Sequence, residues 1–286
     1  LAIVVSVAAM TTTEVLTDRI DRAMRADAAA LLGGDLKLRG PRPIDPLWLE
    51  KANALGVAST ETIEFPSVIG SGSKFELTGV KIITDGYPLK GQLEIADTRA
   101  GIGYPTSSIP TSGTAWADPQ LASKLDIDVG DRVSVGETEL QITQILVFEP
   151  DRGGSFVSLT PRLLMNQADL EASQLIQPGS RVRYITLFAD GDLEQFKALV
   201  EPKLDISQRL RGVVDGRPEV GNALTRATTY LSLAGLLTVL LSGAAIAMTA
   251  NRWATDHIAD WGLARGWGLR GRAARGLCAT AGLAIR

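Results

Sequence analysis

The chain has 286 residues, of which 45% are apolar, and its formal net charge is only -3 at pH 7. This length allows one large domain or two small ones. The 29 basic residues are outnumbered by 32 acidic ones and are spread along the chain, so the sequence predicts no nucleic-acid partner. A single cysteine, Cys278, excludes a disulfide framework within the chain and a zinc site built from several cysteines.

One segment near the C-terminus predicts a transmembrane helix. Residues 230–250 (YLSLAGLLTVLLSGAAIAMTA) carry no charge, and at 1.5 Å per residue they make a helix of roughly 30 Å, the thickness of a bilayer core. A buried helix of a soluble protein is the alternative, but such helices seldom run this far without a charge. Small residues recur along the segment, which indicates close packing against other membrane helices.

The N-terminal segment predicts the end of another membrane helix. Residues 1–10 (LAIVVSVAAM) are apolar but too short to cross a bilayer, so we expect a truncated span. A signal peptide is the rival interpretation, but it would need a basic n-region that the segment lacks. Residues 11–32 predict an amphipathic stalk helix, because Leu16 and Ile20 recur at helical spacing and Gly33 follows as a stop signal.

The residues after residue 250 set the expected orientation. Residues 251–276 are rich in arginine, and basic flanks of membrane helices stay in the cytoplasm, so this segment is predicted to be cytoplasmic. Residues 11–229 then lie on the periplasmic side of a bacterial inner membrane. Residues 277–286 become apolar again and predict the start of a truncated third span.

Residues 33–229 predict an α+β extracytoplasmic domain with a strand–helix–strand core. Asp45 is a helix N-cap followed by Pro46 at the first helical position, and Gly56 ends that helix. A companion unit comes late in the domain, where Asp192 caps a second helix, and the two units are expected to share one sheet. Strands are predicted at Asp35–Arg39, Val57–Phe65, Phe75–Thr84 and Arg181–Phe188.

The middle of this domain has a different pattern. Residues 90–178 combine short alternating segments, such as Thr138–Val147, with closely spaced Gly and Pro turns. We therefore expect a β-rich subdomain inserted into the α+β core. The whole extracytoplasmic domain is expected to be flanked by transmembrane helices.

The sequence predicts no catalytic, cofactor or metal site. Its only histidine, His257, lies in the segment expected to be cytoplasmic, so a His-dependent triad in the folded domain is excluded. Residues 70–74 (GSGSK) are expected to be a hairpin turn because no helix follows. The acidic turn Asp126–Asp131 lacks the glycine and glutamate of a calcium loop, and Trp116 is expected in the core.

Several segments resemble one family of transporters. Residues 156–184 (FVSLTPRLLMNQADLEASQLIQPGSRVRY) and 211–252 (RGVVDGRPEVGNALTRATTYLSLAGLLTVLLSGAAIAMTANR) are similar to the first extracytoplasmic domain and second span of FtsX/MacB-like ABC transporter permeases, most closely the YbbP-type subgroup. Further support comes, in order along the chain, from LTDRIDRAMRADAAALLGGDLKLRG, PSVIGSG, GYPLKGQL and LDIDVGDRVSVGETELQITQIL.

The resemblance implies a non-catalytic permease subunit that works by mechanotransmission. In such families a separate cytoplasmic ABC ATPase drives movement through the stalks of a permease homodimer, which moves or presents a hydrophobic or lipid-like substrate. Membrane lipid and a periplasmic esterase or lysophospholipase are the other implied partners. The segment after the span corresponds to the family's coupling helix, which makes His257, Ile258, Trp261 and Leu263 the candidate ATPase contacts. Several glycines weaken helix there, so the coupling helix is either short or atypical.

Two other function classes fit the same layout. Two spans around an extracytoplasmic α+β domain also describe a sensor that feeds a cytoplasmic signalling module, and a membrane-anchored periplasmic enzyme is a third reading. Further spans downstream would favour the permease, whereas a soluble kinase-like or methyl-accepting domain would favour the sensor. The enzyme is disfavoured because the exported part contains no histidine.

Overall fold

The computed structural model describes residues 2–152, 160–177, 179–213 and 218–256 of the chain. These residues divide into two compact units. The first unit combines the chain up to Ile20 with the part from Ala223 onward, and the second runs from Asp21 to Asn222.

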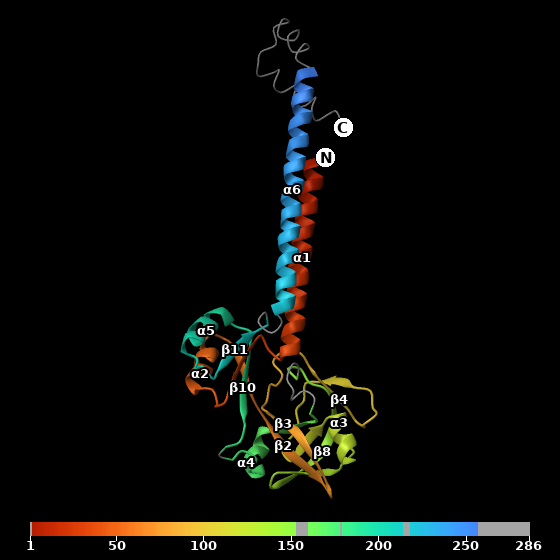
Figure 1. Ribbon diagram of the computed structural model, residues 1–286, viewed down its shortest axis with the longest axis vertical. Coiled ribbons are helices and arrows are strands. Elements are labelled where there is room, and N and C mark those ends of the chain that lie inside the picture. The colour runs from red at the N-terminus through yellow and green to blue at the C-terminus, as the bar shows by residue number, and fades with distance from the viewer. Residues whose placement is uncertain (1, 153–159, 178, 214–217, 257–286) are drawn as a thin grey trace. The chain divides into compact units, whose positions relative to one another are not determined.

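The last described helix contains the segment suited to a membrane. Helix α6 (Pro218–Asp256) includes Leu233–Arg252, with a mean hydropathy of 2.0, and within the described residues this is the one stretch of helix long and apolar enough to cross a bilayer (Figure 1). It overlaps the span predicted at residues 230–250. Leu240 and Leu241 on this helix are exposed, as side chains that face lipid would be.

The first helix is longer than a membrane segment alone. Helix α1 (Ala2–Leu32) is continuous through the predicted stalk, residues 11–32, and Gly33 ends it with a φ of +77°. This left-handed backbone is the usual helix stop and favours glycine. Near that end Arg25 donates to the carboxylate of Asp21 one turn earlier, at 2.7 Å.

The two predicted strand–helix units do share one sheet. Strand β10 lies between β1 and β2 and is antiparallel to both, while β11 pairs with the other edge of β1. Helices α2 and α5 belong to the same part of the domain (Figure 1). The bounds are β1 Leu36–Gly40, α2 Pro46–Ala54, β2 Ala58–Ser71, β10 Arg183–Ala189, α5 Leu193–Val200, the 3-10 turn η3 Glu201–Lys203, and β11 Arg209–Gly212.

Local capping explains both helices. The Asp45 carboxylate accepts from the Leu47 amide at 3.0 Å, and the Asp192 carboxylate accepts from the Gln195 amide at 3.0 Å. The helices pack on the sheet through apolar side chains; Phe188 of β10 and Phe196 of α5, for example, have ring centroids 4.6 Å apart. The α+β fold class predicted from the sequence is therefore confirmed.

A closed ring of strands forms the rest of the second unit. Starting from β2, hydrogen-bonded neighbours run through β3, β9, β6, β8 and β7 and back to β2. Two of these pairs, β3 with β9 and β6 with β8, are parallel. The bounds are β3 Lys74–Ile83, β6 Thr114–Ala117, β7 Arg132–Val135, β8 Thr138–Phe148 and β9 Arg162–Asn166.

The interior of this barrel is apolar. Side chains from all six strands meet there, and helix α3 (Pro119–Leu125) contributes Leu121 and Leu125. The strands expected for residues 90–178 are thus hydrogen-bonded directly to β2 and β3. Strand β2 takes part in both the open sheet and the barrel, because its first half pairs with β10 and its second half with β7.

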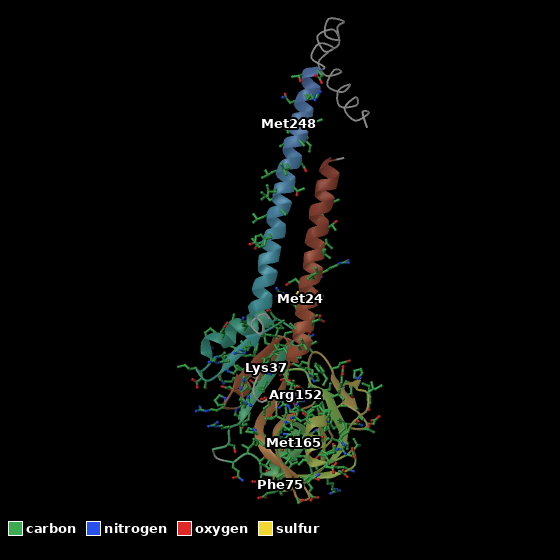
Figure 2. The ribbon with its side chains drawn as sticks, turned by 45° about the vertical axis from the view of Figure 1, so that its right-hand side comes forward. Met24, Lys37, Phe75, Arg152, Met165 and Met248 are labelled. Carbon is green, nitrogen blue, oxygen red and sulfur yellow. The ribbon has the colours of Figure 1, made fainter. Side chains whose placement is uncertain are left out.

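Smaller elements complete the domain. Strands β4 (Leu93–Ala96) and β5 (Tyr104–Thr106) extend the sheet from the edge of β8. The predicted hairpin turn joins β2 to β3, and Phe75 beside it lies at the opposite end of the domain from Lys37 (Figure 2). Trp116 is buried, as predicted. A 3-10 turn, η2 (Gln167–Asp169), leads into the short helix α4 (Leu170–Ser173).

Candidate functional site

The four predicted ATPase contacts, His257, Ile258, Trp261 and Leu263, lie outside the described residues. Their role stays a prediction. The candidate site lies around the end of α1 and consists of groups that the sequence analysis did not single out.

The acidic turn after α3 is held by cations of the protein itself. The guanidinium of Arg99 donates to both carboxylate oxygens of Asp128, at 2.8 and 2.9 Å, and Lys74 pairs with Asp126 at 3.3 Å. Asp131 accepts from the Asp128 backbone amide at 2.8 Å, which closes the turn. These contacts explain the acidic spacing as a surface turn, and no cluster of three potential metal ligands occurs in the described part of the chain.

The last turn of α1 is bound by two loops of the domain. The carbonyl oxygen of Leu31 accepts from the Asp151 amide at 2.8 Å, and that of Gly33 accepts from the amides of Leu89 and Lys90 at 3.0 and 3.2 Å. The carbonyl groups of a last helical turn have no partners within the helix, so these amides supply what the helix lacks. The end of α1 is therefore fixed to the domain by its backbone.

Close approach of a glycine completes this contact. Gly91 has a φ of +80°, and a Cβ atom built on it would lie 2.5 Å from the carbonyl oxygen of Ala30. Only glycine allows both the backbone conformation and this short distance to α1. The loop before β4 is consequently pressed against the final turn of the helix.

Asp151 also begins a buried network of charges. Its backbone has a φ of +38°, and its fully buried carboxylate accepts from Lys81 at 2.5 Å, Lys37 at 2.8 Å and the Tyr87 hydroxyl at 2.6 Å. Lys81 and Lys37 come from β3 and β1, on opposite sides of β2 and β10 in the sheet. The one carboxylate thus connects the end of α1 to two separate strands.

A second half of the network lies deeper in the domain. Lys81 also pairs with Glu149 at 2.7 Å, and the other oxygen of Glu149 accepts from Arg162 at 2.9 Å. Glu64 on β2 approaches Arg162 at 3.4 Å and Lys81 at 3.8 Å. Three carboxylates therefore face three cationic side chains, so the network is close to neutral, which a buried set of charges requires.

The electrostatics follow from burial and from these partners. Burial raises the pKa of Asp151, but Lys81 and Lys37 outweigh that effect and hold it well below the ordinary aspartate value. Burial lowers the pKa of Lys81, yet Asp151, Glu149 and Glu64 raise it above the usual value. Burial and the neighbouring carboxylates raise the pKa of Tyr87. All three groups keep their ordinary charge at neutral pH. The network therefore holds the strands together electrostatically and contains no free base or nucleophile.

Arg152, the residue after Asp151, extends this connection to the barrel. Arg152 donates to the Asp118 carboxylate at 2.5 Å, while the other oxygen of Asp118 caps α3 by accepting from the Leu121 amide at 2.7 Å. Figure 2 marks Arg152 and Lys37 within the second unit. The segment after β8 therefore bridges the end of α1, the buried network and the helix that covers the barrel.

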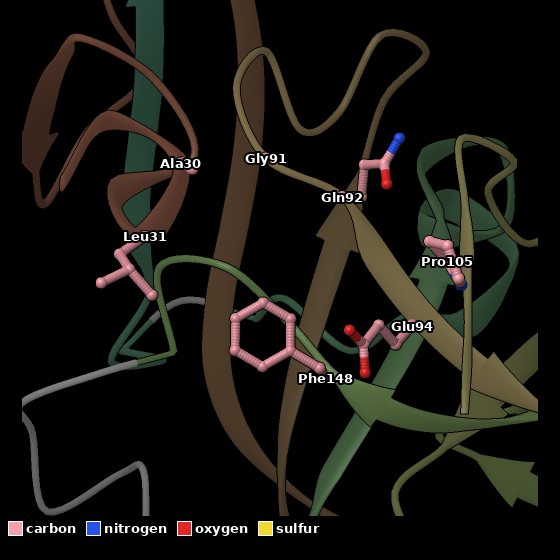
Figure 3. Close-up of a pocket in the computed structure, with 7 residues that line it drawn as sticks. All are labelled: Ala30, Leu31, Gly91, Gln92, Glu94, Pro105 and Phe148. Carbon is pink, nitrogen blue, oxygen red and sulfur yellow. The ribbon is translucent and has the colours of Figure 1, made fainter. Parts of the chain in front are cut away.

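An open groove lies beside the end of α1. Its volume is about 440 Å³, and Figure 3 shows that α1, the loop before β4 and the strands β4, β5 and β8 all contribute to its walls. The residues that line it are Ala30, Leu31, Gly91, Gln92, Glu94, Pro105 and Phe148.

Most of the groove is apolar, and its polar groups are few. Leu31 and Phe148 are exposed large apolar side chains. The carboxylate of Glu94 is directed toward the Phe148 ring (Figure 3). Within the described residues, no hydrogen bond or ion pair engages the side chain of Glu94 or of Gln92. Its lining residues include a single carboxylate and offer no pair of groups suited to acid–base catalysis.

Sequence reasoning missed both features for identifiable reasons. A lysine such as Lys81, which follows Val80 in a strand, normally marks the solvent face, and its partners Glu149 and Asp151 lie about 70 residues away in the chain. Nothing in the local sequence pattern indicates that Lys81, Glu149 and Asp151 are in contact. Tyr87 and Gly91 belong to the segment GYPLKGQL, which was recognised only as part of a family pattern.

Comparison with curated proteins supplies the relationship. No family model matches the chain. The chain is 29% identical over 255 residues to the uncharacterized ABC transporter permease YbbP of Escherichia coli (strain K12). The matched stretch covers 88% of this chain and 31% of that protein, so the chain spans about a third of the length of this curated relative.

Two solved structures are also similar. The extracellular domain of the noncanonic ABC-type transporter YknZ from Gram-positive bacteria has a TM-score of 0.41 and 10% identity, over 62% of this chain and 100% of that one. The periplasmic region of MacB from Actinobacillus actinomycetemcomitans has a TM-score of 0.42 and 9% identity, over 68% of this chain and 96% of that one. The sequence match with YbbP carries the assignment: the chain resembles FtsX/MacB-like ABC transporter permeases of the YbbP type, as its motifs predicted.

Proposed function

We propose that this chain is part of the permease subunit of an ABC transporter in a bacterial inner membrane, with residues 11–229 in the periplasm. The observation that carries the proposal is the match to YbbP along 88% of the chain. The apolar stretch Leu233–Arg252 of α6 supports it, because a permease needs membrane-spanning helices.

In this proposal the subunit is not an enzyme and works by mechanotransmission. A separate cytoplasmic ATPase hydrolyses ATP, and α1 conveys the resulting displacement to the periplasmic domain. The backbone bonds from Asp151 to Leu31 and from Leu89 to Gly33 support such a role, since they leave the end of the helix little freedom to move without the domain. The buried charges around Asp151 then pass the displacement to β1 and β3.

The remaining parts of the proposal concern partners and domain organisation. We propose a homodimer of the permease, contact with membrane lipid, a hydrophobic or lipid-like substrate, and a periplasmic esterase or lysophospholipase that acts beside the domain. The predicted divisions at residues 33, 229 and 250, with an inserted subdomain at about residues 90–178, are kept as the proposed organisation. The proposed coupling segment is 251–276, where His257, Ile258, Trp261 and Leu263 would touch the ATPase.

Co-purification tests the proposal directly. The full-length protein is purified from native membranes in mild detergent, and bound proteins and ATP hydrolysis are measured. We expect a stoichiometric nucleotide-binding subunit that is lost from a Trp261→Ala, Leu263→Ala variant. Leu47→Ala, on an exposed position of α2, is the matched control and should retain the ATPase. A membrane protein that purifies without any ATPase would contradict the permease assignment and favour the sensor.

A further inference from the structure

We propose that the groove beside the end of α1 binds a single-chain amphiphile with a primary amine, and that Glu94 recognises its ammonium group. The inference deepens the proposed transport function by naming a substrate class, and it rests on that function for its biological meaning. The binding itself requires only the described residues of this chain.

The groove is built on a row of paired residues. Glu94 of β4 is the register partner of Phe148 on β8 and of Pro105 on β5. The ladder between β4 and β8 shifts its register directly after this pair, and the side chains of all three residues line the groove. A carboxylate therefore lies between an aromatic ring and a proline ring, with Ala30 and Leu31 of α1 forming the opposite wall (Figure 3).

The apolar part of the groove suits an aliphatic chain. Leu31 is 48% exposed and Phe148 is 39% exposed, so each presents apolar surface that the described protein leaves in contact with solvent. Covering such surface is favourable because it removes apolar area from water. A volume of about 440 Å³ lies within the range of small-molecule sites.

The charge of the groove selects the head group. No cationic residue lines the groove, and three lysines of the described domain have carboxylate partners elsewhere: Lys90 donates to Asp190 at 2.6 Å, and Lys37 and Lys81 donate to Asp151. The negative charge of Glu94 is consequently not neutralised by them. An anionic amphiphile would be repelled, and a neutral one would gain nothing from the carboxylate.

A primary ammonium group matches the polar atoms that are present. It carries three N–H donors and no acceptor, while Glu94 offers two carboxylate oxygens and Gln92 one amide oxygen. Hydrogen bonds between charged partners are about twice as strong as neutral ones. Glu94 and Gln92 therefore indicate that the ligand carries an amine. The apolar side chains of Leu31, Phe148 and Pro105 indicate that it has a single aliphatic chain.

The position of the groove connects binding with movement. Ala30 and Leu31 form one wall and also belong to the turn that Asp151 fixes to the domain. Because these bonds fix the end of α1 to the domain, a displacement of α1 would carry the groove and its bound amphiphile along with the domain.

Photolabelling of the full-length protein in phosphatidylcholine nanodiscs tests the site. The probe is dodecylamine with a diazirine in its chain, and its comparison is the alcohol with the same chain and diazirine. We expect the amine to label peptides that contain residues 92–94, 105 and 148, and excess dodecylamine to prevent the labelling. Glu94→Gln should lower labelling by the amine about tenfold, as the loss of one charge-assisted contact predicts, and leave labelling by the alcohol unchanged.

Matched variants and competitors make each outcome decisive. Glu50→Gln removes the same charge from an exposed position on α2 and should label like the unmodified protein. Unchanged labelling of Glu94→Gln, equal labelling by amine and alcohol, or labelling confined to α6 would each overturn the proposal. So would competition by oligolysine but not by dodecylamine, because the site would then bind a basic peptide. None of these readouts needs the ATPase, so failure here and failure of the co-purification are distinguishable.

Discussion

The backbone amide of Asp151 lies 2.8 Å from the carbonyl oxygen of Leu31, and its carboxylate accepts from the buried ammonium of Lys81 at 2.5 Å. One residue therefore closes the final turn of α1 and neutralises a lysine at the centre of the sheet. A force on the end of the helix therefore acts on the buried Asp151 carboxylate. Separating this carboxylate from its partners would greatly lower the stability of the domain.

Asp151→Asn should destabilise the domain strongly. The substitution keeps the shape of the side chain but leaves Lys37 and Lys81 without their shared negative charge, and removing one partner of a buried pair lowers the free energy of unfolding by about 3 kcal/mol or more. Thermal unfolding in detergent, followed by the fluorescence of tryptophans including buried Trp116, measures the effect. Asp190→Asn breaks the exposed pair with Lys90 and should change the free energy by less than about 1 kcal/mol. Equal effects would show that the buried network adds nothing.

The same carboxylate predicts how stability depends on pH. The pKa of Asp151 is lower in the folded protein than in the unfolded chain, where it is about 3.9. Below pH 4 the unfolded chain binds a proton that the folded protein does not, so the stabilisation by Asp151 is fully present above that pH and declines as the pH falls. Unfolding midpoints from pH 6 to pH 3 should drop less steeply in Asp151→Asn. A parallel decline in both proteins would argue against this linkage.

Gly91→Ala should loosen the end of α1 more than Gly86→Ala does. Both glycines have left-handed backbones, with φ of +80° and +82°, so both substitutions carry a similar strain of about 1 kcal/mol. Only at Gly91 would the new Cβ meet the carbonyl of Ala30; nothing lies within 4 Å of it at Gly86. Hydrogen exchange of the Leu89 amide, which donates to the end of α1, should therefore accelerate in Gly91→Ala alone. Similar exchange in the two variants would rule out the close contact.

Leu240→Arg should impair membrane insertion of α6. An arginine near the centre of a span raises the free energy of insertion by about 2.5 to 3.5 kcal/mol. Resistance to carbonate extraction measures integration into the membrane. Leu47→Arg, on the exposed surface of α2, serves as the matched control and should integrate normally. Undiminished integration of Leu240→Arg would contradict the span.

Much of the fold could be predicted because its signals are local. Helix ends are marked by bonds or backbone conformations confined to a few neighbouring residues, as at Asp45 with Pro46, at Asp192 and at Gly33. The same signal precedes α3, where Asp118 and Pro119 repeat the cap of α2, yet the surrounding sequence led us to expect mainly short strands and tight turns there. That helix was missed although its local chemistry was present.

The candidate site could not be predicted because it depends on distant partners. Lys81 and Asp151 lie 70 positions apart, and Glu94 meets Phe148 only through the pairing of β4 with β8. Alternation along a strand tells which face a side chain takes, but it does not tell which strand lies beside it. The ring of strands and the position of the groove are consequences of that pairing.

The double role of β2 has a consequence for how the domain folds. Its first half pairs with β10, which is more than a hundred residues later, and its second half pairs with β7. Neither neighbour has been synthesised when residues 58–71 leave the ribosome. The barrel is complete only after β9 has been added, and the open sheet only after β10 and β11 have followed. Pairing across such long stretches of chain makes folding slow, in the range of milliseconds to seconds or longer. We therefore expect the domain to reach its native state only after β10 has crossed the membrane, with the first half of β2 lacking its β10 partner until then. Protease resistance of residues 58–61 in nascent chains that end before β10 would refute this order.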